Sequence, residues 1–159
     1  MIASTPRDEA RPTAETPKLE RFFRGAAGLD VDKSDLKRYR DFVNEKIYDL
    51  LLRAQATAKA NARSVIEPFD LPLTKGLQER IHEFEKIDLE IELKPILDHL
   101  AARPPLDLPY SEETEAEFPD IAGGLSVALA RVFKCVDPLA NKPHSEQWER
   151  CRRVFDLLL

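Results

Sequence analysis

Residues 63–71 read Arg-Ser-Val-Ile-Glu-Pro-Phe-Asp-Leu, a short β-branched segment followed by a proline and an acid. β-Branched residues favour extended backbone, and proline lacks the N–H that a helix interior needs, so this segment should interrupt a helix. The preceding stretch, residues 35–62, has helical apolar spacing and contains no glycine or proline. Asp70, two residues before Pro72, is predicted to cap a third helix that runs towards residue 87. The segment is therefore predicted to join a long helix to a short one.

The long helix needs a partner that crosses it. At 1.5 Å per residue it would span about 42 Å, which exceeds the width of a small domain. A shorter helix is predicted before it, beginning at Thr16-Pro17 and ending at Gly28. Asp32 and Asp35 are predicted to form a capping box at the start of the long helix. Two short neighbours cannot cover the whole apolar stripe of such a helix, so another element must bury the remainder.

The second half of the chain repeats this order of elements weakly. It is predicted to contain a short helix that ends before Arg103, an acidic loop at residues 112–117, and a longer helix from Pro119 to Asp137. A last helix is predicted to be capped by Ser145. The predicted fold class is all-α, with one compact domain made of two helix-loop-long helix-loop-helix units. The units are residues 17–86 and 87–159, preceded by a flexible tail at residues 1–16.

Composition places the chain among globular proteins and limits its partners. The 159 residues carry a formal charge of −5, divided unevenly into +2 for residues 17–86 and −6 for residues 87–159. An acidic chain lacks the overall basic character that is typical of nucleic-acid-binding proteins. No apolar run reaches the roughly 18 residues of a membrane span, and the N-terminus has no secretory pattern. We therefore expect a cytoplasmic location, no membrane partner, and reduced thiols at the two cysteines.

Residues 17–86 resemble a histone fold. In archaeal histones an arginine precedes a short β-like loop and an aspartate starts the third helix, and the two side chains form a clamp. Arg63 and Asp70 have the same spacing of seven residues. The whole chain resembles a family of uncharacterised bacterial proteins with two histone folds in tandem, which implies an intrachain pseudodimer. The second half departs from the pattern in its shorter central helix, and Arg131 has Pro138 where an acid would complete a clamp.

The resemblance implies binding to double-stranded DNA through phosphate contacts, without sequence preference. Asp30 departs from the pattern, because archaeal histones commonly have an arginine there. Arg63 and Asp70 are also predicted to act as a structural clamp that joins the loop to the third helix. The residues that the resemblance assigns to DNA binding are Arg21, Arg24, Lys33, Arg63 and Ser64.

The sequence offers little support for catalysis. The three histidines lie far apart, and the spacing of Cys135, His144 and Cys151 matches no standard zinc site. Gly123-Gly124 lies within an apolar helical pattern and is predicted to allow close helix packing, not to bind phosphate. No nucleophile with an adjacent base is evident. We therefore expect no enzymatic activity, no metal, no cofactor and no small-molecule substrate.

Two functions follow from these observations. The first is a histone-like, nucleoid-associated protein that binds duplex DNA weakly, in a salt-sensitive manner, through the first half. The alternative is a histone-fold module that pairs with another protein or with itself and does not bind DNA. The net charge favours the second function, and the family resemblance favours the first.

Overall fold

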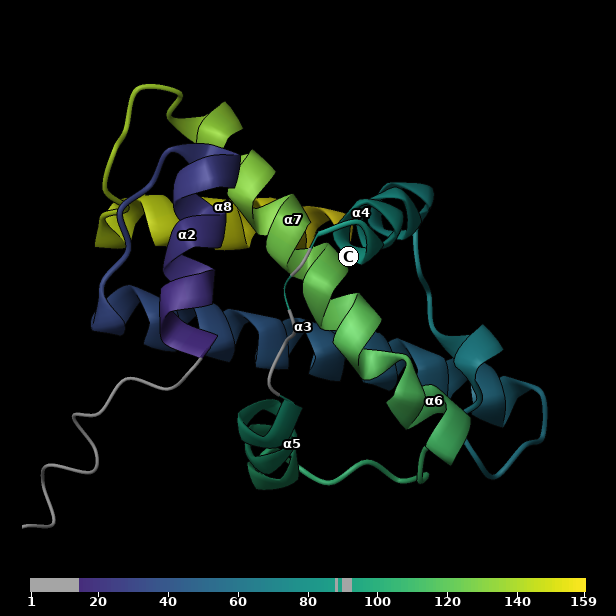
Figure 1. The fold of residues 1–159 in the computed structure, drawn as a ribbon. Helices are drawn as coiled ribbons and strands as arrows, with labels where there is room; N and C mark the ends of the chain where they lie inside the picture. The colour runs from purple at the N-terminus through teal and green to yellow at the C-terminus, as the bar shows by residue number, and fades with distance from the viewer. Residues whose placement is uncertain (1–14, 88, 90–92) are drawn as a thin grey trace, which may run out of the picture.

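A computed structural model describes residues 15–87, 89 and 93–159, and over these residues the fold is all-α (Figure 1). Residues 1–14 of the predicted tail lie outside the described residues, and the first helix begins at Glu15. The helices are α2 (Glu15–Ala27), α3 (Lys33–Ala60), α4 (Lys75–Glu85), α5 (Leu93–Ala102), α6 (Glu112–Ala116), α7 (Phe118–Val136) and α8 (Ser145–Leu158), with a 3₁₀ turn, η1, at Pro68–Asp70.

Several predicted helix starts were wrong. Thr16, the predicted N-cap of the first helix, lies within α2, which begins at Glu15. Asp70 does not cap α4, because its carboxylate is bound within the preceding loop, and Thr74 caps the helix instead. The acidic stretch predicted as a loop forms most of α6, which Ser111 caps by accepting a hydrogen bond from the Thr114 N–H at 3.1 Å. The N-cap position of α8 is His144, one residue before the predicted cap.

The long helix α3 begins as the sequence predicts. The Asp35 N–H donates to the Asp32 carboxylate at 3.0 Å, and the Asp32 N–H donates back to the Asp35 carboxylate at 3.0 Å, which completes the capping box. The helix runs for 28 residues and buries an apolar stripe along its length. α7 crosses α3 in the middle of the molecule (Figure 1), where the buried hydroxyls of Tyr39 and Ser126 lie 2.7 Å apart. α7 therefore buries part of the apolar stripe of α3.

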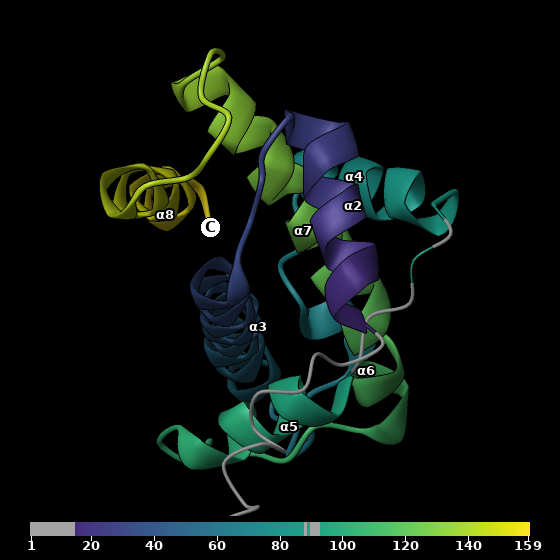
Figure 2. The ribbon, with the colours of Figure 1, turned by 60° about the vertical axis from the view of Figure 1, so that its left-hand side comes forward.

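The last helix, α8, lies beside the N-terminal half of α3 and runs in the same direction. Figure 2 shows both helices nearly end-on, next to each other. The buried Trp148 indole N–H donates to Asp35 at 3.1 Å. Further along both helices, the rings of Phe155 and Phe42 pack edge to face, with their centroids 4.8 Å apart. Lys46, with a side chain only 1% exposed, contacts Asp156 near the end of α8. This contact therefore combines aromatic packing with buried polar bonds.

The third helix, α4, packs closely on α7 and runs in the opposite direction. A Cβ atom at Gly123 would lie 2.1 Å from the Phe84 ring, and one at Gly124 would lie 2.5 Å from the Ile81 side chain. The predicted close packing at Gly123-Gly124 is thus confirmed. Because the two glycines carry no side chains, the Phe84 and Ile81 side chains of α4 pack directly against the backbone of α7.

None of the helices in the described part of the chain is long and apolar enough to cross a membrane. Cys135 is exposed and Cys151 is buried, and both thiols are free. Burial raises the pKa of the Cys151 thiol to about 12, so this cysteine is an inert core residue at neutral pH.

Candidate functional site

Two pairs of loops lie at opposite ends of α3, and one of them contains Arg63 and Ser64, two of the five residues predicted to bind DNA. The first pair, here called the Asp30 loop pair, consists of residues 28–32 and 137–144. Gly28 ends α2 with a φ of 65°, a left-handed conformation that glycine adopts without strain. The Asp30 N–H then donates to the Asn141 carbonyl at 2.8 Å, so the backbones of the two halves meet at this end.

Two ion pairs bind the acidic side chains of residues 28–32. The Arg24 Nε lies 3.0 Å from the Asp30 carboxylate, and both side chains are 66% exposed. The Lys142 ammonium lies 3.2 Å from Asp32. Hydrogen bonds from the Ser34 hydroxyl, the Asp35 N–H and Lys142 hold the pKa of Asp32 well below its ordinary value, so this acid remains charged across the physiological range.

The second pair, the Ile66 loop pair, consists of residues 61–71 and 107–111. The Ile66 N–H donates to the Pro109 carbonyl at 2.9 Å, and the Ser111 N–H donates to the Ile66 carbonyl at 3.0 Å. These two bonds form an isolated parallel β-bridge between Ile66 and Tyr110. The Thr114 hydroxyl also donates to the Ile66 carbonyl at 2.8 Å. The β-branched segment of the first half thus pairs with the segment that precedes α6 and α7 in the second half.

Arg63 and Asp70 form a bidentate ion pair within the Ile66 loop pair. Both guanidinium Nη atoms donate to the Asp70 carboxylate at 2.6 Å, and the Glu67 N–H donates to the same group at 2.8 Å. The Arg63 hydrogen bonds lower the pKa of Asp70, whose side chain has no exposed surface, and raise the pKa of Arg63. The guanidinium also lies 4.8 Å from the centre of the exposed Phe69 ring. The bonds to Asp70 engage one N–H of each Nη atom, and the carboxylate offsets the positive charge that Arg63 could offer to a phosphate.

The structure divides the predicted DNA-binding residues into two groups. Lys33 is the first residue of α3, whereas Arg63 and Ser64 follow its C-terminal end, about 42 Å away at 1.5 Å per residue. The exposed Arg21 and Arg24 lie on α2, towards the same end of α3 as Lys33. The five residues therefore do not form one surface of the first half.

Sequence analysis missed the residues that the second half contributes to each loop pair. Asn141 and Lys142 complete the Asp30 loop pair, and the exposed ion pair between Lys59 and Asp107 completes the Ile66 loop pair. No local pattern marks these residues, because their partners lie 48 to 111 positions away in the chain. Because residues 87–159 have a net negative charge, Lys142 did not stand out as a candidate basic residue.

The described residues show no arrangement that would hold a metal ion: no three histidine, cysteine or carboxylate side chains come together there. Cys135 is exposed and Cys151 is buried, so these two thiols do not share a surface. The loop pairs therefore consist of backbone hydrogen bonds and ion pairs, an arrangement that joins the two halves of the chain.

Two solved structures have the same overall fold as this chain. A crystal structure of a protein from Thermus thermophilus is 54% identical, with a TM-score of 0.83, and the match covers 90% of this chain and 97% of that one. A 1.9 Å crystal structure of a protein from Aquifex aeolicus is 28% identical, with a TM-score of 0.77, and the match covers 90% of this chain and 94% of that one.

Sequence comparison finds a related protein and a matching family. An uncharacterized protein from Aquifex aeolicus (strain VF5) is 29% identical over 139 residues, which are 87% of this chain and 81% of the relative. A family model described as a domain of unknown function, DUF1931, matches residues 19–156. The chain therefore belongs to the DUF1931 family.

Proposed function

We propose that the chain is a single-chain histone-fold pseudodimer that serves as a protein-interaction module. The two loop pairs support the fold assignment. In each pair, the loop that follows one unit's long helix lies beside the segment that precedes the other unit's long helix, and backbone hydrogen bonds join them. The crossing of α3 and α7, and the bidentate contact between Arg63 and Asp70, are further features that the resemblance to archaeal histones implies.

The pseudodimer is asymmetric. α8 runs in the same direction as the long helix that it covers, whereas α4 runs opposite to α7. Residues 71–74, which include Pro72, lie outside any helix and join the clamp to α4. Only the Ile66 loop pair has a clamp, and only one central helix is 28 residues long.

The functional proposal rests on one observation. Basic residues at both loop pairs are already paired with carboxylates of the same chain. A phosphate that approached any of these residues would have to displace a carboxylate of the same chain, so the surface offers little net attraction to DNA. The pairs are Arg24 with Asp30, Lys142 with Asp32, Lys59 with Asp107, and Arg63 with Asp70.

An apolar surface favours a protein partner. A groove of about 370 Å³ lies between α4, α7 and α8, and its walls include Leu77, Val132 and Phe155. Beside it, Leu157 and Leu158 at the end of α8 are 85% and 72% exposed. Contiguous apolar surface of this kind costs free energy in water and is typical of protein interaction sites.

Weak binding to duplex DNA is the second candidate, and one observation favours it. Arg21 is exposed on α2 and forms no ion pair with a described carboxylate. Arg21, Arg24 and Lys33 lie towards the same end of α3, where they could contact the phosphates of one duplex segment. Such binding would lack sequence preference and would be strongest at low salt.

A gel-shift titration with a random-sequence duplex separates the two candidates. We expect no shift at about 50 mM or about 200 mM salt. A shift at low salt that weakens steeply at the higher concentration would overturn the protein-module proposal in favour of DNA binding. In that case the double substitution Arg21→Glu with Arg24→Glu should abolish the shift. Arg153→Glu, which changes an exposed arginine on α8, is the matched control and should leave it unchanged.

A further inference from the structure

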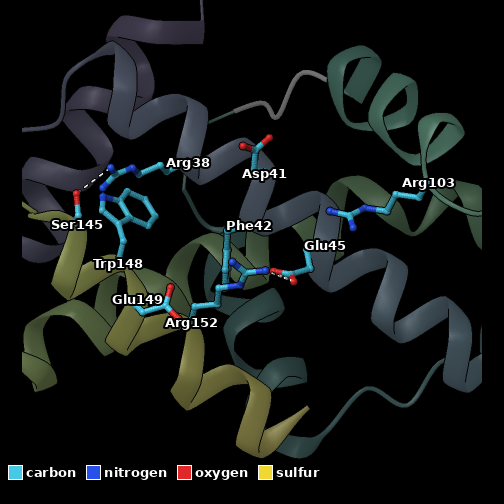
Figure 3. Close-up of a pocket in the computed structure, with 9 residues that line it drawn as sticks. All are labelled: Arg38, Asp41, Phe42, Glu45, Arg103, Ser145, Trp148, Glu149 and Arg152. Carbon is cyan, nitrogen blue, oxygen red and sulfur yellow. Dashed lines mark hydrogen bonds and ion pairs between the residues drawn. The ribbon is translucent and has the colours of Figure 1, made fainter.

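Two grooves of the described chain are lined in part by α8, and they differ in polarity. One, of about 520 Å³, lies where α3, the end of α5 and α8 meet (Figure 3). Three arginines and three carboxylates line it, so it offers no net charge to an ionic ligand: Arg38, Arg103, Arg152, Asp41, Glu45 and Glu149. The other is the groove of about 370 Å³ between α4, α7 and α8, here called the apolar groove. Its exposure to water costs more free energy, because most of its wall is apolar.

The charged residues at the apolar groove are already paired. Arg80 and Arg131 line the groove, and Glu83 on α4 contacts both of them. Glu79 also contacts Arg80, at 3.3 Å, and contacts Lys75 at 2.8 Å. The signs of these charges therefore alternate along the edge of the groove, and little net charge remains among these residues. Such an edge does not select a strongly charged partner, and it does not repel a second copy of itself.

The last turn of α8 places exposed leucines next to the apolar groove. Val154 and Leu158 line the groove from this helix. Leu157 lies three residues after Val154, one turn along the same side of α8, and is 85% exposed. Leu158 is part of the wall and is still 72% exposed. One face of the molecule thus has both a projecting apolar group and a depression that can receive one.

A projection and a depression on the same face are what a two-fold dimer requires. In such a dimer the same surface patch of each copy meets itself, so each copy must supply both halves of the contact. A rotation of 180° about an axis beside Leu158 brings Leu157 of each copy towards the groove of the other. A cavity of about 150 Å³ accepts a benzene molecule, so the apolar groove has room for a leucine side chain.

The size of the patch determines how strong this contact is. Eleven residues line the apolar groove, and Leu157 adds one more. A standard protein interface has roughly 20 to 30 residues on each side. Since small interfaces are typical of weak or transient complexes, we expect a dissociation constant of roughly 10 to 100 μM.

We propose that the chain forms a two-fold homodimer in solution, in which Leu157 and Leu158 of each copy cover the apolar groove of the other. The inference rests on the proposed function, because it names a second copy of the chain as the partner of the protein-interaction module. Burial of the exposed leucines and of the groove wall supplies the free energy of association. The paired charges of α4 and α7 lie at the edge of the contact.

Analytical ultracentrifugation of the full chain over a wide range of protein concentration tests the dimer. We expect a reversible equilibrium between monomer and dimer that changes little between about 50 and 500 mM salt, because the contact is apolar. A monomer at every concentration up to about 300 μM would overturn the inference, since the groove would then serve a different protein. Species that grow beyond the dimer would also overturn it, since the contact would then be head to tail. The gel-shift titration tests the protein-module proposal separately, so the failure of one is distinguishable from the failure of the other.

Substitution of the projecting leucine tests one half of the contact. Leu157→Asp should weaken dimerisation at least tenfold, because a symmetric contact loses two buried leucines and would have to bury two carboxylates. The side chain is 85% exposed in the monomer, so circular dichroism should show an unchanged fold. Leu139→Asp changes a leucine that is 93% exposed in the loop before α8, and this matched control should dimerise as the wild type does. Equal dimerisation of the two variants would refute the proposal.

Substitution in the groove tests the other half. Gly76 lines the apolar groove from α4, and a Cβ atom there would meet no other atom within 4 Å. Gly76→Glu should therefore fold normally and weaken dimerisation at least tenfold, because the new side chain occupies the groove. Gly25→Glu, in an equally open position on α2, is the matched control. Wild-type dimerisation of a folded Gly76→Glu variant would place the contact elsewhere on the molecule and overturn the inference.

Discussion

The two long helices are covered in different ways, and the difference shows what holds each half in place. α4 meets α7 through glycines, with Gly123 directly against the Phe84 ring. α8 meets α3 through large side chains and buried polar bonds, such as that from Trp148 to Asp35. The first contact depends on the absence of side chains, and the second depends on donors and acceptors that must match. Steric changes should therefore disrupt the α4–α7 contact, and loss of a single donor should weaken the α3–α8 contact.

The largest effect is expected for Gly123→Leu. A Cβ atom at this position would lie 2.1 Å from the Phe84 ring, so a leucine would force α4 away from α7. We expect the free energy of unfolding to fall by about 3 kcal/mol or more. Urea unfolding followed by circular dichroism measures this change. Gly25→Leu, in an open position on α2, is the matched control and should change stability by no more than about 1 kcal/mol. Equal effects at both glycines would contradict the close packing of α4.

A smaller effect is expected for Trp148→Phe at the α3–α8 contact. Phenylalanine fills part of the same space but cannot donate to Asp35, whose carboxylate is buried. We expect a loss of about 1 to 3 kcal/mol, since a buried charged acceptor loses one hydrogen bond. Because the sole tryptophan is removed, unfolding is followed by circular dichroism. Asp35→Ala, which removes the acceptor, should reduce the additional cost of Trp148→Phe in a double-mutant cycle. Strictly additive losses would show that the indole N–H contributes nothing to this contact.

The smallest effect is expected for Arg63→Gln, which removes one partner of the clamp before α4, and its size should depend on pH. The pKa of Asp70 is lowered in the folded protein relative to its ordinary value of 3.8, chiefly by hydrogen bonds from Arg63. This stabilisation is therefore fully present above about pH 4 to 5 and is lost as the pH falls towards the lowered pKa. Arg63→Gln should lower the melting temperature at pH 7, and its difference from the wild type should shrink below about pH 4.

The exposed pair of Arg24 and Asp30 provides the control for this measurement. Both of its side chains are 66% exposed, so Arg24→Gln should have little effect on the melting temperature at any pH. A difference between wild type and Arg63→Gln that stays constant from neutral to acidic pH would argue against an ionised Asp70 as the partner of Arg63.

Several features could be predicted from the sequence because they depend on neighbouring residues. The capping box of Asp32 and Asp35 joins residues three positions apart, and the apolar period of α3 needs no distant partner. The double glycine within an apolar period correctly indicated close packing. The start of α4 could not be predicted, because Asp70 has the residue type of a helix cap but its carboxylate binds Arg63.

The all-α class, the 28-residue central helix and the spacing of Arg63 and Asp70 follow from helix periodicity, capping and local chain geometry, which are properties of neighbouring residues. Which charged side chains meet depends instead on how the two halves pack. Lys142 neutralises Asp32 across 110 positions, and Arg103 comes within reach of the groove that Arg38 lines. Coulombic attraction and hydrogen bonding depend on distance in space, so side chains far apart in sequence acquire their partners only when the two halves pack together.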